Sequence, residues 1–235
     1  MKKTFIAVAI GAIVGVPAFA ADMPVKSHAP IAFDWRGFYI GAQIGAVSHR
    51  DGQRLSSPTF AMPNATTDSA TGFVGGGHAG YNFQFDRYVY GIEADFEGNS
   101  TRVKHVLPTT IFPVGTVSDA RLNWQGSLRG RLGIAVDRAL FYGTGGWAFA
   151  NFNDSYNLPG TPFNQSVTST RSGWTAGAGI EYAMLNNLTV RAEYRYTDFG
   201  SHTDSLTVFL LPPGVSANKD TENAFRIGAS YKFGR

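Results

Sequence analysis

Residues 88–97 read YVYGIEADFE and alternate between two kinds of side chain. The even positions hold Tyr, Tyr, Ile, Ala and Phe, whereas Glu93, Asp95 and Glu97 stand at odd positions between them. Successive side chains of a β-strand point to opposite faces, so a period of two predicts a strand with one apolar and one polar face.

Seven further runs repeat this alternation. They cover residues 35–47, 71–85, 120–135, 140–152, 172–182, 188–197 and 224–233. Each is predicted to be a strand whose large apolar side chains share one face. In the run 120–135 we expect Leu122 and Trp124 on the apolar face and Asn123 on the polar face. Gly143, Gly145 and Gly146 weaken the pattern in the run 140–152.

The connections between these runs alternate in length. Residues 86–87, 136–139 and 183–187 form tight links. The long ones, residues 49–70, 99–119, 153–171 and 199–223, contain Ser, Thr, Asn, Pro and Asp, which are typical of loops. In an up-and-down meander this alternation places every tight turn at one end and every long loop at the other. Outer-membrane barrels have short periplasmic turns and longer outside loops.

The polar face carries charges of both signs in the middle of the strands. Those residues are Glu93, Asp95, Glu97, Arg129, Arg131, Glu181, Arg191, Glu193, Arg195, Arg226 and Lys232. Eight strands enclose an interior just wide enough for side chains to fill, and buried charges must be paired. We therefore expect an all-β, eight-stranded, antiparallel up-and-down transmembrane β-barrel whose lumen holds a charge network. A lipocalin-like barrel with its apolar face around a ligand is the alternative, but runs this aromatic fit lipid better.

The N-terminus is predicted to be a cleaved signal peptide, residues 1–20. Lys2 and Lys3 precede an apolar stretch, and Ala18-Phe19-Ala20 provides a small-x-small cleavage signal. Residues 21–34 are then a periplasmic lead segment, and residues 35–235 form the barrel. Cleavage leaves 18 basic residues against 17 acidic ones, so the charge gives no reason to expect nucleic-acid binding.

The last run resembles the C-terminal signal that the barrel-assembly machinery recognises, an alternating strand that ends in an aromatic residue. Here it comprises Phe225, Ile227, Ala229, Tyr231 and Phe233, and Gly234 and Arg235 follow.

The whole mature chain resembles the alphaproteobacterial outer-membrane immunogenic proteins, which are small surface antigens with an OmpA/OmpX-like barrel. The resemblance lies in residues 34–41, 80–84, 90–95, 128–133, 142–148, 173–182 and 191–196. It implies an integral protein of the bacterial outer membrane with a structural and surface-antigen role in envelope integrity. Its partners would be outer-membrane lipid and lipopolysaccharide, with the secretion and barrel-assembly machinery during biogenesis. The oligomeric state stays open.

No residue pattern indicates an enzyme, a cofactor or a metal site. The chain has no cysteine, and its glycine clusters lack the Lys-Ser/Thr pair of a phosphate-binding loop. His49, His105 and His202 are expected on outer loops, solvated or in contact with a ligand such as haem. His78 and Glu93 can face each other in the lumen, but the sequence fixes no nucleophile beside them.

The lumen charges leave two functions open. A static network would keep the barrel closed. Ion pairs that rearrange would give a small porin-like channel for ions or small solutes. Eight-stranded barrels are usually packed, which favours the closed form.

Overall fold

The computed structural model describes residues 33–56, 66–106, 117–157, 164–206 and 214–233. The only regular secondary structure in these residues is β-strand. This part of the chain contains no helix with the length and apolar character needed to cross a bilayer. The strands are β1 (Gly37–Ser56), β2 (Thr66–Phe85), β3 (Tyr88–Asn99), β4 (Arg102–Val106), β5 (Val117–Val136), β6 (Ala139–Asn157), β7 (Asn164–Ala183), β8 (Leu188–Leu206) and β9 (Gly214–Lys232). The expected signal peptide lies outside the described residues.

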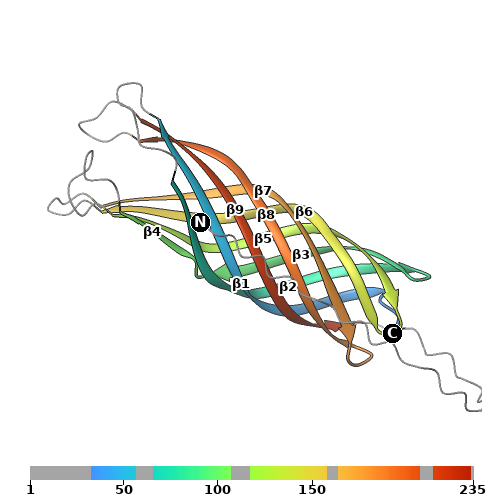
Figure 1. The fold of residues 1–235 in the computed structure, drawn as a ribbon. Helices are drawn as coiled ribbons and strands as arrows, with labels where there is room; N and C mark the ends of the chain where they lie inside the picture. Colours follow the sequence, from blue (N-terminus) through green and yellow to red (C-terminus); the bar gives the residue numbers. More distant parts are fainter. Residues whose placement is uncertain (1–32, 57–65, 107–116, 158–163, 207–213, 234–235) are drawn as a thin grey trace, which may run out of the picture. The chain divides into compact units, whose positions relative to one another are not determined.

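The strands form one antiparallel sheet that closes on itself (Figure 1). Its order is β3-β2-β1-β9-β8-β7-β6-β5-β4, and an additional pairing of β3 with β5 joins the edges. Because β3 and β4 both pair with β5, they occupy successive parts of one position in the barrel. The predicted eight-stranded, up-and-down barrel is confirmed.

The short turns and both ends of the described chain lie at one end of the barrel. Asp86 and Asp137 have φ angles of 54° and 52° in the two tightest turns, a left-handed conformation that aspartate tolerates. The backbone N–H of Phe33 donates to the Asp137 carbonyl at 3.3 Å, and that of Lys232 donates to Asn187 at 2.8 Å. In an outer-membrane barrel this end faces the periplasm, because such barrels place their short turns there.

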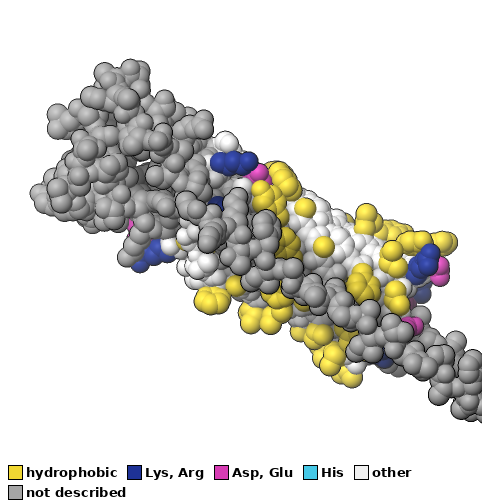
Figure 2. All heavy atoms as spheres, viewed as in Figure 1, with side chains coloured by type: hydrophobic (Ala, Val, Ile, Leu, Met, Phe, Trp, Pro, Cys, Tyr) yellow, Lys and Arg dark blue, Asp and Glu magenta, His cyan; other side chains and the backbone are white. Residues whose placement is uncertain are grey.

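The apolar side chains face outward. Phe73 is 75% exposed, Leu132 70% and Ile44 63%, whereas the alternate positions of the same strands are buried. Figure 2 shows hydrophobic side chains along the middle of the wall, with charged side chains towards its two ends. A wall of this kind is suited to lipid, and closure supplies every strand with backbone partners on both sides.

The strands are longer than the sequence predicted. β1 continues to Ser56 and pairs with β2 from Thr66, although residues 49–70 were expected to form a loop. The other three long connections are shortened in the same way. The polar composition was misleading because the backbone ladder continues above the apolar band, where side chains no longer need to be apolar. His49, His105 and His202 consequently lie on β1, β4 and β8 rather than on loops.

A β-bulge reverses the predicted faces at one point of β5. The register shifts between Leu122 and Trp124, so two residues of β5 oppose one of β6. Leu122 is therefore buried in the lumen beside Phe152 and Phe199, and Asn123 is exposed. The prediction that Leu122 shares a face with Trp124 was wrong because the extra residue changes the alternation.

Candidate functional site: the barrel lumen

The lumen is lined by charged side chains in balanced numbers. Seven acidic and seven basic side chains are buried in the described part of the barrel. They are Glu93, Asp95, Glu97, Glu181, Glu193, Asp220 and Glu222, with Arg129, Arg131, Arg171, Arg191, Arg195, Arg226 and Lys232. Burying this many charges is tolerable only if they are paired and hydrogen-bonded.

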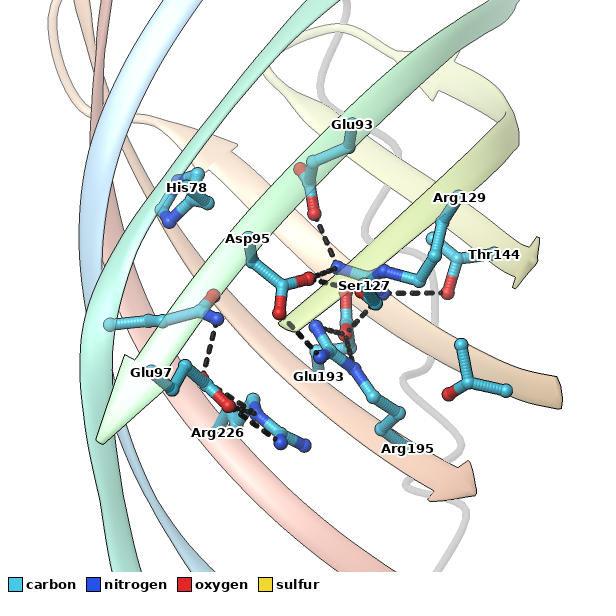
Figure 3. A network of polar contacts seen from close by, with 12 residues as sticks. His78, Glu93, Asp95, Glu97, Ser127, Arg129, Thr144, Glu193, Arg195 and Arg226 are labelled. Carbon is cyan, nitrogen blue, oxygen red and sulfur yellow. Dashed lines mark hydrogen bonds and ion pairs between the residues drawn. The ribbon is translucent and has the colours of Figure 1, made fainter. Parts of the chain in front are cut away.

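Arg129 lies at the centre of the lumen and is fully buried. Its guanidinium contacts Glu93 at 2.5 Å, Asp95 at 3.1 Å and Glu193 at 2.8 Å, and it donates to Thr144 Oγ1 at 3.0 Å. Figure 3 shows these side chains converging from several strands. One arginine thus contacts three carboxylates.

Two further arginines complete this central cluster. Arg195 contacts Asp95 at 3.2 Å and Glu193 at 2.9 Å, and Arg191 contacts Glu93 at 2.5 Å. Each of the three carboxylates therefore contacts two of the three guanidinium groups, and the cluster is neutral. We call these six residues the central cluster: Glu93, Asp95, Glu193, Arg129, Arg191 and Arg195.

The central cluster bridges the full width of the barrel. Glu93 and Asp95 belong to β3, while Arg191, Glu193 and Arg195 belong to β8. Three strands separate β3 from β8 in either direction around the sheet. The two strands therefore stand opposite each other, and their side chains meet across the lumen.

A second group of contacts lies on the extracellular side of the central cluster. Arg226 binds Glu97 at 2.9 Å and approaches Glu222 at 3.5 Å. Gln43 and Gln125 donate to Glu97 at 2.6 and 3.0 Å. Further out, Asp220 contacts Arg171 at 2.5 Å and His49 at 3.3 Å. The charges thus continue towards the outer mouth.

On the periplasmic side, Arg131 pairs with Glu181 and lies 3.9 Å from the centroid of the Tyr142 ring. The Tyr39 hydroxyl donates to Glu93 at 2.7 Å and is itself within 3.4 Å of Arg131, so it links this pair to the central cluster.

An apolar group follows at the periplasmic end. Phe33 and Trp35 precede β1 and pack with Val89, Leu140 and Ala183. The Phe33 and Trp35 rings meet edge to face with centroids 4.7 Å apart, and the Trp35 backbone N–H donates to Gln84 at 2.7 Å. We call Phe33 and Trp35 the periplasmic plug.

Of the eleven charged residues singled out from the sequence, ten lie in these connected ion pairs. Lys232 lies apart from them: it donates to the Asp34 carbonyl and lies 4.9 Å from the Phe33 ring centroid. In the C-terminal strand the apolar residues point outward, as its alternation predicts: Phe225, Ile227 and Tyr231 are exposed on the outer wall.

Sequence reasoning missed several lumen residues. Glu222, Asp220, Arg171 and His49 fell within stretches assigned to loops. The signal was present, because the inward alternation at Arg226 continues backwards through positions 224, 222 and 220. The same extension leads from Thr175 to Arg171, and from Gln43 to His49. Tyr39 lies in the predicted run 35–47, but its role as a link between Arg131 and Glu93 was not foreseen.

His78 and Ser230 are the nearest approach to a catalytic pair. His78 Nε2 and Ser230 Oγ are 2.8 Å apart, and both side chains are buried. Glu93 is on the neighbouring strand, but its carboxylate is held by Arg129, Arg191 and Tyr39. Among the residues that the structure describes, His78 Nδ1 has no hydrogen-bond partner, so nothing there orients the histidine as the base of a catalytic triad.

Little space remains beside the central cluster. A cavity of about 10 Å³ lies between Asp95, Ser127, Arg195 and Arg226, with room for roughly one water molecule. Arg226 lines this cavity, and its buried Nη1 has no hydrogen-bond partner among the described residues.

Comparison with known proteins agrees with this architecture. Residues 6–233 match the family model of the outer membrane protein β-barrel domain. The 31 kDa outer-membrane immunogenic protein of Brucella melitensis is 34% identical over 247 residues, covering 98% of this chain and 100% of the relative. The 22 kDa outer membrane protein of Rhizobium leguminosarum bv. viciae is 32% identical, covering 91% of this chain and 83% of the relative.

Two solved structures share the fold. The outer membrane protein OprG of Pseudomonas aeruginosa has a TM-score of 0.56 at 15% identity, covering 85% of this chain and 97% of that one. The outer membrane protease OmpT of Escherichia coli has a TM-score of 0.51 at 9% identity, covering 88% of this chain and 100% of that one. At these identities the likeness concerns the fold alone. On the strength of the family model and the sequence relatives, this chain belongs to the outer-membrane protein β-barrel family and is an integral protein of the bacterial outer membrane.

Proposed function

We propose that this protein is a closed, non-catalytic barrel that stabilises the outer membrane and presents its extracellular connections at the cell surface. The observation that carries the proposal is the central cluster. Its six charged side chains cross the lumen, and Arg129 alone contacts Glu93, Asp95 and Glu193. A solute passing through must separate these contacts and leave buried charges without their partners, and an uncompensated buried charge costs about 3–5 kcal/mol.

Two further features support closure. The cavity beside the central cluster holds about 10 Å³, which is less than a small solute needs. At the periplasmic end, Trp35 is only 2% exposed and packs with Phe33 and Leu140. The plug and the central cluster thus obstruct the lumen at two separate levels.

Surface presentation is supported by the relatives and by the strands. The Brucella melitensis relative carries the name immunogenic protein. In this chain the strands extend beyond the apolar band at the extracellular end, so that part of the barrel wall itself stands outside the membrane. A non-catalytic role is favoured because the His78–Ser230 pair is buried and lacks an orienting carboxylate.

Biogenesis follows the route proposed from the sequence. Export would use the predicted signal peptide, residues 1–20. The barrel-assembly machinery would then recognise the strand that carries Phe225, Ile227, Ala229, Tyr231 and Phe233. In the folded barrel this strand pairs with β1, opposite Ile40 and Ile44 among others, so it also closes the barrel.

Single-channel conductance of the refolded mature protein in a planar bilayer tests the proposal. Gel mobility with and without heating establishes that the sample is folded, and a known porin in the same bilayer serves as the positive control. We expect a silent bilayer. Stable openings that change when Arg129 or Glu93 is neutralised would replace the closed scaffold with a small pore.

A further inference from the structure

Two arginines stand side by side on the outer wall, near the extracellular end of the barrel. Arg102 of β4 is the direct cross-strand neighbour of Arg121 of β5. Their side chains are 44% and 53% exposed. Like charges directly opposite each other on neighbouring strands are destabilising, so this arrangement needs a compensating anion.

Asp119 compensates only part of this charge. Arg102 donates to it through Nε at 2.8 Å and also through Nη2, whereas the Arg121 Nη2 contact is longer, at 3.4 Å. Two guanidinium groups around one carboxylate leave one excess positive charge. Exposed donor groups with excess positive charge are suited to an anion with several oxygens, because guanidinium forks bind phosphate in a bidentate manner.

The position of Arg102 and Arg121 along the barrel axis indicates which anion they would meet. Just below it, Trp124 stacks on Phe96 with ring centroids 5.4 Å apart and meets Phe149 at 6.2 Å. Such aromatic groups mark the membrane–water interface. Arg121 comes three residues before Trp124 in β5, and because the bulge makes these residues span only two ladder steps, Arg121 is about 5 Å above the rings in a tilted strand. The headgroup layer is about 5–7 Å thick, so the guanidinium groups lie at the level of lipid headgroups.

The surroundings change character at the same level. Asn123 is exposed on the outer wall and donates to the Asn151 amide oxygen at 3.2 Å on the neighbouring strand. Below the aromatic group, the outward positions of β5 are Leu128, Leu132 and Ile134. From the middle of the barrel towards its extracellular end, the wall therefore changes from apolar side chains to aromatic rings and then to amides and arginines. This order matches that of a lipid, whose acyl chains lie in the middle of the bilayer and whose headgroup lies at the surface.

We propose that Arg102 and Arg121 bind a phosphate group of an outer-leaflet lipid, namely the phosphorylated glycolipid lipopolysaccharide. Asp119 positions the two guanidinium groups and limits their excess charge. The site is independent of whether the barrel conducts, since it lies on the outside of the wall.

Titration of the refolded protein with lipopolysaccharide in zwitterionic micelles tests this site, with native mass spectrometry as the readout. The double variant Arg102→Gln/Arg121→Gln should bind about 30-fold more weakly, which corresponds to about 2 kcal/mol for two cations near an anionic lipid surface. Lys219→Gln is the matched control. Lys219 is 61% exposed at the same end, but it approaches a single acid, Asp198, at 3.7 Å. Its loss should change the affinity less than threefold.

Three further arms decide between explanations. Asp119→Asn removes the competing carboxylate and should tighten binding, a change that a misfolded protein cannot mimic. Lipopolysaccharide stripped of its phosphates should bind the wild type and the double variant equally. Competition by millimolar inorganic phosphate, if complete, would indicate a free-anion site and overturn the lipid assignment. Wild-type affinity in the double variant, with heat-modifiable mobility intact, would overturn the site itself.

Discussion

Replacing Arg129 with methionine removes a side chain that contacts three buried carboxylates, those of Glu93, Asp95 and Glu193. The central cluster then holds three acids and two arginines, and one negative charge is uncompensated inside the barrel. Removing one partner of a buried ion pair costs about 3–5 kcal/mol. Because Arg191 and Arg195 still contact all three carboxylates, we expect a loss near the lower end of that range.

The free energy of unfolding is measured by urea titration in phosphatidylcholine vesicles, with tryptophan fluorescence and heat-modifiable mobility as independent readouts. The double variant Arg129→Met/Glu193→Gln restores neutrality, and we expect it to recover about 1–2 kcal/mol through coupling of the two sites. The control is Arg36→Met, since Arg36 is 65% exposed and pairs with Asp34 at 3.0 Å. That surface pair should contribute less than about 1 kcal/mol.

Two results would refute the reasoning. The first is a loss below about 1 kcal/mol for Arg129→Met, the range of a surface pair, which would place the lumen charges in a well-hydrated environment. The second is a double variant no more stable than the single one. That outcome would mean that the loss comes from packing rather than from uncompensated charge.

Four other predictions follow from separate features of the barrel. Trp35→Ala should cost about 3–5 kcal/mol in the same urea titration, because the residue is buried in the periplasmic plug, and an unchanged midpoint would contradict that packing. A Cβ on Gly76 would lie 2.0 Å from the Phe96 carbonyl oxygen, whereas one on Gly77 would have its nearest neighbour at 3.6 Å. The folded fraction on gels should therefore fall for Gly76→Ala and not for Gly77→Ala. Phe233→Ala should lower the amount of assembled barrel in cells while leaving refolding in detergent unchanged, and equal assembly in cells would argue against the C-terminal signal. Hydrogen bonds donated by the Arg102 side chain lower the pKa of the Asp119 carboxyl from 3.8 to about 2. Because the folded pKa is the lower one, the stability that Asp119 adds is present above about pH 4 and is lost as the pH falls towards 2. In urea titrations, the free energies of unfolding of wild type and Asp119→Asn should therefore converge only in that acid range.

Alternation alone predicted most of the fold. Glu93 and Phe96 were assigned to opposite faces, because in a strand the side chains alternate between the two faces and the position in the sequence therefore gives the face. The assignment failed at Leu122, because a bulge adds one residue and nothing in the local residue types marks it. Strand ends were misplaced where the strands leave the membrane, because polar residues there were interpreted as loops.

The pairing inside the lumen could not be predicted in the same way. Which carboxylate meets which guanidinium depends on the register of every intervening strand and on closure of the sheet. Arg191 and Glu93 contact each other although they are 98 residues apart. The sequence therefore predicted which charges point inward, but not that Arg129 would contact three acids or that Tyr39 would link two groups.

The position of β3 opposite β8 has a consequence for how the barrel is made. No hairpin contains both Asp95 and Arg195, and no open sheet brings them together, because they meet only across a closed lumen. A half-assembled sheet in lipid would keep neighbouring pairs such as Glu93–Arg129, but Asp95–Arg195 and Glu93–Arg191, which meet across the lumen, would be missing. Insertion and closure should therefore occur as one event. The charges that oppose entry into the bilayer before closure form, after closure, the ion pairs that slow unfolding out of the membrane.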